Sequence, residues 1–361
     1  MNRLARHVKG HPLLWGLLLA AVGIRVFSSD PLRVEELYSG LAYPPLSRFM
    51  RGVTGLLPVS LGDLFYGSLV LLFMWSVFGL FEKFSREGRK AFFDGRSWMK
   101  VLAWPMGVYV VFNLAWGLNY DRLGIAHQLD LNVEESDTSG LGGLAEELLV
   151  QTNRYSSASE SLRSTTTPEL MDRTLRAYGE VERIHPFLAY RPPSVKASLF
   201  GTVGNHLGYT GYYNPFTAEA QLNDAIPQVL KPFVLCHEVA HQLGYARESE
   251  ANFVGFLAAR ASGDSLFLYS AFFDMFLYAN GALYMRDSLQ ARRNLSMLDS
   301  SVRRDIAELR AFRRKYQGPV ERMIDVVYDR YLRMNRQPQG RASYSQVVQW
   351  LLAYRRKNGG L

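Results

Sequence analysis

A sequence with the spacing of a catalytic metal site, HEVAH, occupies residues 237–241. On an α-helix, positions i and i+4 lie on one face, so the two imidazoles can bind one metal ion. Glu238 would then lie beside the metal, where it can take a proton from a water. Residues 234–243 carry no other charge and no proline, as expected for a buried helix, and Pro232 and Gly244 predict where it begins and ends. The alternative is an ordinary helix that carries two unrelated histidines.

A catalytic zinc site needs a third protein ligand and a position open to water. The metzincin pattern HExxHxxGxxH would place that ligand at Arg247, which cannot bind a metal, so this class is excluded. The gluzincin pattern instead requires a glutamate on the following helix, and Glu248 satisfies it. Asn252 stands four residues later, where Asp is usual. Its side-chain carbonyl can accept a hydrogen bond from a ligand histidine, but it carries no charge, so we expect it to hold the ring more weakly than Asp would.

Glu250 is the alternative third ligand. Residues two apart on a helix point about 200° away from each other, so only one of Glu248 and Glu250 can face the metal. We expect Glu248, because Asn252 lies on its face and Ala251 is small enough for close helix approach. Both acids could instead be solvated residues in the first turn of a helix.

Three apolar runs in the N-terminal part of the chain predict transmembrane helices at about residues 12–27, 61–81 and 101–118. The second and third have roughly the 20 residues that a bilayer requires. The first is shorter, and its alternative is a cleavable signal peptide. Basic residues precede the first run and separate the second from the third: Arg3, Arg6, Lys9, Lys83, Arg86, Arg89, Lys90, Arg96 and Lys100. By the positive-inside rule, the loop 28–60 and everything after Tyr120 are expected outside the cytoplasm.

The chain therefore divides into a membrane region, residues 1–120, and an extracytoplasmic domain, residues 121–361. The predicted fold class is mainly α (α+β), with a small β-sheet. Residues 194–223 are rich in Gly and Tyr and predict a hairpin or edge strand, which could pair with an extended peptide. Candidate substrate or oxyanion donors in this stretch are Tyr212, Tyr213 and His206, although each could equally be a packed or surface residue.

Residues 266–285 form a further apolar stretch, interrupted by Asp274 and Asn280. We expect a buried helix there, with a fourth span as the alternative. The net charge of +8 comes mostly from arginines in the C-terminal part. No groove-reading motif accompanies them, so nucleic-acid binding is not expected, and a position beside anionic lipid headgroups explains the charge more simply.

Further motifs carry a resemblance to a known family. They are Tyr43-Pro44, Pro58-x-Ser60-x-Gly62-Asp63, GYYNPFTxEAQ at 211–221, HEVAHQLG at 237–244, Glu250-Ala251-Asn252-Phe253, Tyr331-Leu332 and Ser343-Tyr344. Together they resemble, over nearly the whole chain, a family of bacterial membrane proteins catalogued as a domain of unknown function. The resemblance implies membrane spans followed by a zincin-like domain, and no known substrate. The segment around Glu250 is also similar to third-ligand helices of repressor-cleaving metallopeptidases and of membrane-bound prenyl-protease relatives.

These observations predict a membrane-anchored, zinc-dependent peptidase that acts on a peptide or protein. Zn²⁺ would be held by His237, His241 and Glu248, and Glu238 would be the general base. The alternative is a non-catalytic membrane protein with a structural zinc site. Glu238 argues mildly against it, because a structural site has no need of that residue. A transporter is disfavoured, since the three spans show no repeat and no convincing ion pair.

Overall fold

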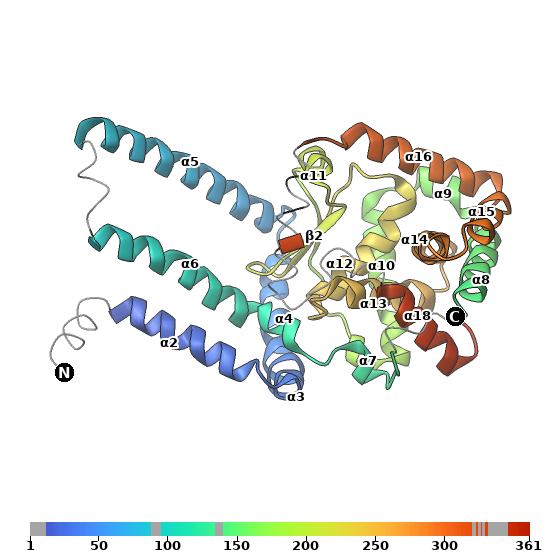
Figure 1. Cartoon of the computed structure of the whole chain (residues 1–361), viewed down its shortest axis with the longest axis horizontal. Coiled ribbons are helices and arrows are strands. Elements are labelled where there is room, and N and C mark those ends of the chain that lie inside the picture. Colours follow the sequence, from blue (N-terminus) through green and yellow to red (C-terminus); the bar gives the residue numbers. More distant parts are fainter. Residues whose placement is uncertain are drawn as a thin grey trace.

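The structure is a computed structural model, and it describes residues 12–87, 95–133, 140–319, 323, 326, 329–330 and 346–361. Within these residues the chain is mostly helical and contains one small three-stranded sheet (Figure 1). This agrees with the predicted mainly α class. Three long apolar helices extend from one side of a helical body that contains the sheet.

The extended helices are α2 (Pro12–Phe27), α5 (Leu61–Glu87) and α6 (Gly95–Ala115). α2 packs along α6. In α5, the segment Leu61–Gly79 is long and apolar enough to cross a membrane. α2 meets the same test only together with the segment after it, from which it is bent by 101°, and α6 contains a shorter apolar stretch, Ala103–Ala115. Two or three of the described helices can therefore span a membrane, counting α14 below.

The predicted third span, 101–118, is misplaced at its C-terminal end. The helix stops at Ala115, and the next residues form a 3₁₀ turn, η3 (Gly117–Asp121). Trp116, between the two, has a non-helical backbone with φ of −162°.

The segment that connects the first two spans is largely helical. It contains α3 (Pro31–Arg33), the π-helical η1 (Val34–Ala42) and α4 (Tyr43–Thr54). The side chain of Asp30 accepts the backbone N–H of Leu32 at 3.0 Å and so caps α3. Pro31 lies in the first turn of α3, where its missing N–H group would have no helical partner. Pro44 and Pro45 lie at the start of α4, which continues directly from η1.

The sheet consists of β1 (Val195–Ala197), β2 (Gly211–Asn214) and β3 (Glu219–Leu222), in the order β1-β3-β2. β1 is parallel to β3, whereas β2 and β3 form an antiparallel hairpin in which Tyr213 pairs with Ala220. In the turn, Asn214 Oδ1 accepts the N–H of Phe216 at 2.9 Å. This confirms the predicted hairpin, and β2 is the edge strand next to β3.

The remaining helices form the body of the molecule. They are α7 (Ile125–Gln128), α8 (Leu141–Arg154), α9 (Ala158–Ser164), α10 (Thr167–Ile184), η4 (Pro186–Leu188), α11 (Gly201–Leu207), η5 (Gln228–Leu230), α12 (Lys231–Gln242), α13 (Glu248–Ala261), α14 (Ser265–Tyr284), α15 (Ser288–Ser296), α16 (Ser300–Tyr316) and α18 (Gln346–Asn358). Their apolar faces enclose one large core around α12, α13 and α14.

α14 contains the apolar stretch predicted at 266–285. It is long and apolar enough for a span, yet 72% of it is buried inside the body, against α8, α12 and α13. One of its polar breaks is paired there, because Asn280 donates to the carbonyl of Ala291 at 3.1 Å and accepts from Asn294 at 3.0 Å. The burial favours the buried helix over the fourth span.

Some sequence motifs lie outside the described residues. These are Tyr331-Leu332, Ser343-Tyr344 and the basic residues Arg3, Arg6, Lys9, Arg89 and Lys90. Other basic residues pair within the body, such as Arg304 with Glu160 at 3.0 Å and Arg355 with Glu147 at 2.6 Å. The attraction to lipid headgroups stays a prediction.

Candidate metal centre

The two histidines of the HEVAH sequence lie one turn apart on α12. Pro232 is in the first turn of this helix, and Gly244 follows its end with φ of +89°, so both predicted boundary signals act as expected. The two imidazole centroids are 4.7 Å apart. His237, Glu238 and His241 offer possible ligand atoms that all lie within 4.8 Å of one another.

The next helix brings a second carboxylate to the histidines. α13 begins at Glu248, whose Oε2 lies 3.3 Å from Nε2 of His237 and 3.8 Å from Nε2 of His241. Glu250 points elsewhere: its Oε1 lies 3.5 Å from Nη1 of Arg247. The geometry therefore favours Glu248 over Glu250, as the helical spacing suggested, and metal binding by Glu248 stays a prediction.

Close contact between α12 and α13 makes this convergence feasible. A Cβ on Gly255 would lie 3.0 Å from the backbone N of His237 and 3.1 Å from its Cα. Backbone atoms cannot move aside as a flexible side chain can, so a glycine is needed at this crossing. The sequence pointed to Ala251 as the small residue of α13; it is fully buried, but the closest approach is at Gly255.

The two histidines differ in what holds their far ring nitrogens. Nδ1 of His241 lies 2.7 Å from the carbonyl oxygen of Tyr245, and this backbone partner could not be seen in the sequence. Asn252, the predicted brace, is buried and contributes to the raised pKa of His237, but Nδ1 of His237 has no hydrogen-bond partner among the described residues. A partner on the far ring nitrogen holds an imidazole in the orientation that a metal requires.

Two residues that the sequence did not single out hold the end of α12. Trp116 donates from Nε1 to the carbonyl of His241 at 3.0 Å, with its ring at a steep angle to the imidazole. Gln242 accepts from Tyr190 Oη at 2.6 Å and donates to the carbonyls of Ser194 and Ala218 at 2.8 and 2.7 Å. The sequence carried only weak signals for these two roles. Trp116 is an aromatic residue near the end of an apolar run, and Gln242 is an amide next to His241.

The edge strand β2 begins directly beside Glu238. A Cβ on Gly211 would lie 2.6 Å from Oε1 of Glu238 and 2.9 Å from its Cγ, so only glycine lets the strand come this close. The edge strand predicted within residues 194–223 therefore begins next to the HEVAH helix. The other oxygen, Oε2, is buried without a hydrogen-bond partner among the described residues.

The three candidate oxyanion donors have other partners. The hydroxyl of Tyr212 donates to Asp63, and that of Tyr213 lies 3.3 Å from the hydroxyl of Tyr43. The ring of His206 packs at 5.0 Å from that of Tyr316. The geometry gives no support to an oxyanion role for any of them.

The electrostatic environment between the two helices favours positive charge. Burial alone would lower the pKa of His237, but the hydrogen bond with Glu248 and the charges of Glu238 and Glu248 raise it to about 9. Burial would raise the pKa of Glu248, yet its bonds to both histidines hold it well below the usual value. Burial raises the pKa of Glu238 to about 7, against the pull of the imidazoles. A site that stabilises a cation between two imidazoles and a carboxylate fits a divalent metal ion.

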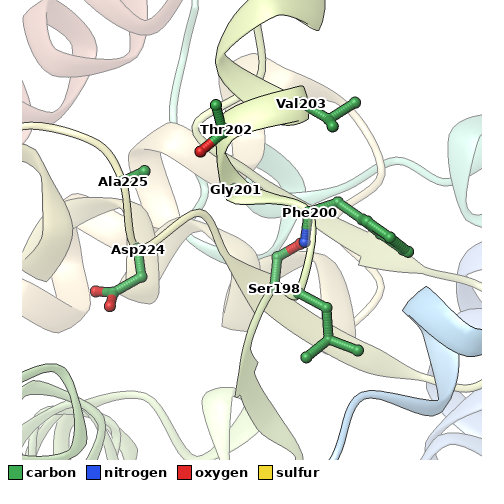
Figure 2. Close-up of a pocket in the computed structure, with 8 residues that line it drawn as sticks. Ser198, Phe200, Gly201, Thr202, Val203, Asp224 and Ala225 are labelled. Atoms are coloured by element: carbon green, nitrogen blue, oxygen red, sulfur yellow. The ribbon is translucent and has the colours of Figure 1, made fainter.

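A shallow hollow elsewhere on the body takes no part in this cluster (Figure 2). It is lined by Ser198, Leu199, Phe200, Gly201, Thr202, Val203, Asp224 and Ala225. Its one acid, Asp224, lies 2.6 Å from Nζ of Lys231, which is buried at the start of α12. The hollow offers no comparable group of ligands.

Comparison with known families assigns the chain. The model of the family described as "Protein of unknown function (DUF3810)" matches residues 38–352. The chain belongs to this family. The matched part of this DUF3810 protein begins in η1 and ends in α18, so it includes α4, α5, α6, the sheet and both site helices. No curated protein and no solved structure matches the chain.

Proposed function

We propose that this DUF3810 protein is a membrane-anchored, zinc-dependent peptidase. The observation that carries the proposal is the convergence of two imidazole Nε2 atoms and Oε2 of Glu248, beside a second carboxylate, on two packed helices. Two histidines and a carboxylate are a donor set of catalytic zinc sites, which leave a position open for water. His237, His241 and Glu248 would hold the ion. Zinc would acidify a water and polarise the scissile carbonyl.

Glu238 is the residue suited to move the proton. It follows His237 directly, so its carboxylate lies beside the ligand face of α12 and against the start of β2. It would take a proton from the attacking water and pass it to the leaving amine.

The sheet supports a peptide as the substrate. Among the described residues β2 pairs only with β3, so an extended peptide could bind along its other edge through backbone hydrogen bonds. Gly211 places the beginning of that strand in contact with Glu238. A peptide bound there would pass close to the general base.

Two features support a more specific proposal about the class of metal site and about the side of the membrane on which the domain lies. The glutamate at the start of the helix after HEVAH supports a gluzincin-like arrangement within a zincin-like domain. The basic segment between α5 and α6, with the apolar character of the spans, supports an extracytoplasmic position for the domain.

Metal analysis combined with one substitution tests the proposal. Wild type, Glu238→Gln and His237→Ala should be purified and analysed for bound zinc, and each assayed on a peptide library. We expect zinc in wild type and in Glu238→Gln, no zinc in His237→Ala, and a loss of hydrolysis of about 10²–10⁴-fold in Glu238→Gln. Addition of a chelator should abolish hydrolysis by wild type.

The outcomes separate the two predicted functions. Wild type that binds zinc but cleaves nothing would favour the structural zinc site over the peptidase. Full activity of Glu238→Gln on a peptide that wild type cleaves would remove the general-base role. Absence of zinc from wild type would overturn the proposal.

A further inference from the structure

The helix α4 has its polar and apolar faces reversed relative to a helix in water. Its buried residues are Tyr43, Ser47, Arg51 and Thr54. On the outside, Leu46 is 37% exposed, Phe49 70%, Val53 50% and, just after the helix, Leu56 83%. We call these last four residues the outer face of α4.

The buried polar residues are paired inside the protein. Arg51 donates to the carbonyl of Pro192 at 3.0 Å and to Oγ of Ser47 at 3.2 Å. Thr54 shares a hydrogen bond of 2.8 Å with Ser194. The polar side chains on the inner face of α4 therefore form specific hydrogen bonds with the body. The reversed arrangement of polar and apolar faces is not a consequence of loose packing.

Other surface helices of the same body show the usual pattern. α16 buries Val302, Ile306 and Leu309 and exposes arginines such as Arg303 and Arg310. An outer face that is mostly apolar is costly in water and marks an interaction site. What covers the outer face of α4 must therefore be apolar.

The position of α4 identifies the partner. It lies in the chain between α2 and α5. α5 is apolar enough to cross a membrane, and α2 is so only together with the segment that contains α4, from which it is bent by 101°. Figure 1 shows α4 crossing near the ends of the apolar helices, where these meet the body. A helix that runs across the ends of membrane spans lies at the bilayer surface.

We propose that the outer face of α4 is inserted into the lipid bilayer at the boundary between headgroups and acyl chains. Leu46, Phe49, Val53 and Leu56 would contact acyl chains. The proposal goes beyond the peptidase function and does not depend on a metal, although it does require that α5 lies in a membrane.

The inserted helix would also fix the distance of the candidate metal centre from the bilayer surface. On its inner face, Tyr43 Oη and Ser47 Oγ both donate to the carbonyl of Gln242, at 2.8 and 3.0 Å. Gln242 directly follows His241 at the end of α12. The end of the HEVAH helix therefore rests on the helix that we place in the bilayer surface, and segments close to the membrane would reach the site first.

Site-specific fluorescence tests the insertion. The single native cysteine, Cys236, is fully buried, so introduced cysteines can be labelled selectively. Phe49→Cys would carry a bimane label on the outer face, Phe73→Cys on α5 (69% exposed) is the membrane control, and Leu289→Cys on α15 (80% exposed) is the aqueous control. Each full-length variant is reconstituted in phosphatidylcholine vesicles, with and without bromine on the acyl chains. Retention of a monodisperse, folded protein is checked for each.

We expect brominated lipid to quench the labels at 49 and 73 and to leave the label at 289 unchanged. Quenching at 73 without quenching at 49 would overturn the inserted helix and leave the membrane anchor standing. Protection of the label at 49 from aqueous iodide without quenching by brominated lipid would mean that protein, such as a second copy of the chain, covers this face, and would also overturn it. Absence of quenching at 73 would remove the membrane anchor itself.

Discussion

The imidazole Nδ1 of His241 lies 2.7 Å from the carbonyl oxygen of Tyr245, four residues further along the chain. A carbonyl can only accept a hydrogen bond, so this contact favours the tautomer with the proton on Nδ1. Nε2, which lies 3.8 Å from Glu248, is then free to donate its electron pair to a metal. The chain reverses at Gly244, and this turn is what returns Tyr245 to the histidine.

The first prediction concerns this turn. Gly244 has φ of +89°, and a Cβ there would lie 3.0 Å from Oδ1 of Asn119 and 3.0 Å from a ring carbon of Tyr43. Gly244→Ala should therefore displace the Tyr245 carbonyl and lower zinc affinity as well as stability. Gly263→Ala is the matched control, because its φ is +64° and nothing lies within 4 Å. In the control, the free energy of unfolding should fall only by the backbone strain of an alanine at positive φ, about 1–3 kcal/mol, and zinc affinity should be unchanged. Equal zinc affinities of the two variants would contradict the orienting role of the turn.

Local spacing explains why the centre of the site could be predicted. His237 and His241 are placed by helical periodicity alone, and α13 begins at Glu248, close enough in sequence for its register to be inferred. The partners that could not be predicted are distant in sequence. Trp116 is 125 residues from His241, and no local pattern links them.

The region before α5 could not be predicted because it reverses the usual rule. Sequence interpretation assumes that polar residues face water, whereas α4 buries Ser47 and Arg51 and exposes Phe49. The same reversal is now the strongest indication of what that helix contacts.

The second prediction separates the two acids of α13. In Glu248→Gln, one convergent ligand oxygen becomes an uncharged amide, so zinc affinity should fall by at least about tenfold, or 1.4 kcal/mol. Glu250→Gln should keep zinc affinity within a few-fold, since the carboxylate of Glu250 faces Arg247 and not the imidazoles. Its stability should not fall, because burial raises the pKa of Glu250 and an amide has no buried charge. Zinc titration of both variants measures the two affinities, and thermal unfolding checks that each variant is folded. A larger loss of zinc affinity in Glu250→Gln would move the third ligand by two residues.

The third prediction concerns the crossing of α12 and α13. Gly255→Ala would place a methyl group 3.0 Å from the backbone of His237, so the helices must separate and Glu248 must recede from the imidazoles. We expect lower stability and weaker zinc binding. Gly281→Ala, in α14 with nothing within 4 Å, should instead gain about 0.5–1 kcal/mol from helix propensity. If Gly255→Ala also gained stability, the close approach would have no structural importance.

The fourth prediction concerns topology. An alkaline phosphatase reporter fused after Tyr120 should be active outside the cytoplasm, and one fused near Arg89, in the basic segment, should be inactive. A green fluorescent protein reporter at the same positions should give the opposite pattern, because it reports cytoplasmic fusions. Reversed signals from both reporters would place the body and its candidate metal centre in the cytoplasm.

The fifth prediction concerns the junction between α5 and the sheet. The carboxylate of Glu219 on β3 is fully buried and accepts the N–H groups of Leu61 and Gly62, at 3.1 and 2.5 Å, at the start of α5. A negative charge at this end is favoured by the helix dipole. A Cβ on Gly62 would overlap the side-chain amide of Gln221 and lie 2.8 Å from that of Asn214, so a larger residue would displace two buried amides. The junction therefore joins the apolar helix directly to the strand that pairs with β2.

Glu219→Gln keeps the shape of this carboxylate but exchanges one acceptor oxygen for a donor, which leaves a buried N–H without a partner. We expect a loss of about 1–3 kcal/mol in the unfolding free energy of the detergent-solubilised protein. Glu180→Gln is the matched control, because its carboxylate forms only an exposed pair with Arg183 at 2.7 Å and should change stability by less than about 0.5 kcal/mol. Zinc affinity should stay unchanged in both, since neither residue contacts the histidines. If the two variants were equally stable, the buried carboxylate would not be what holds α5 to the sheet.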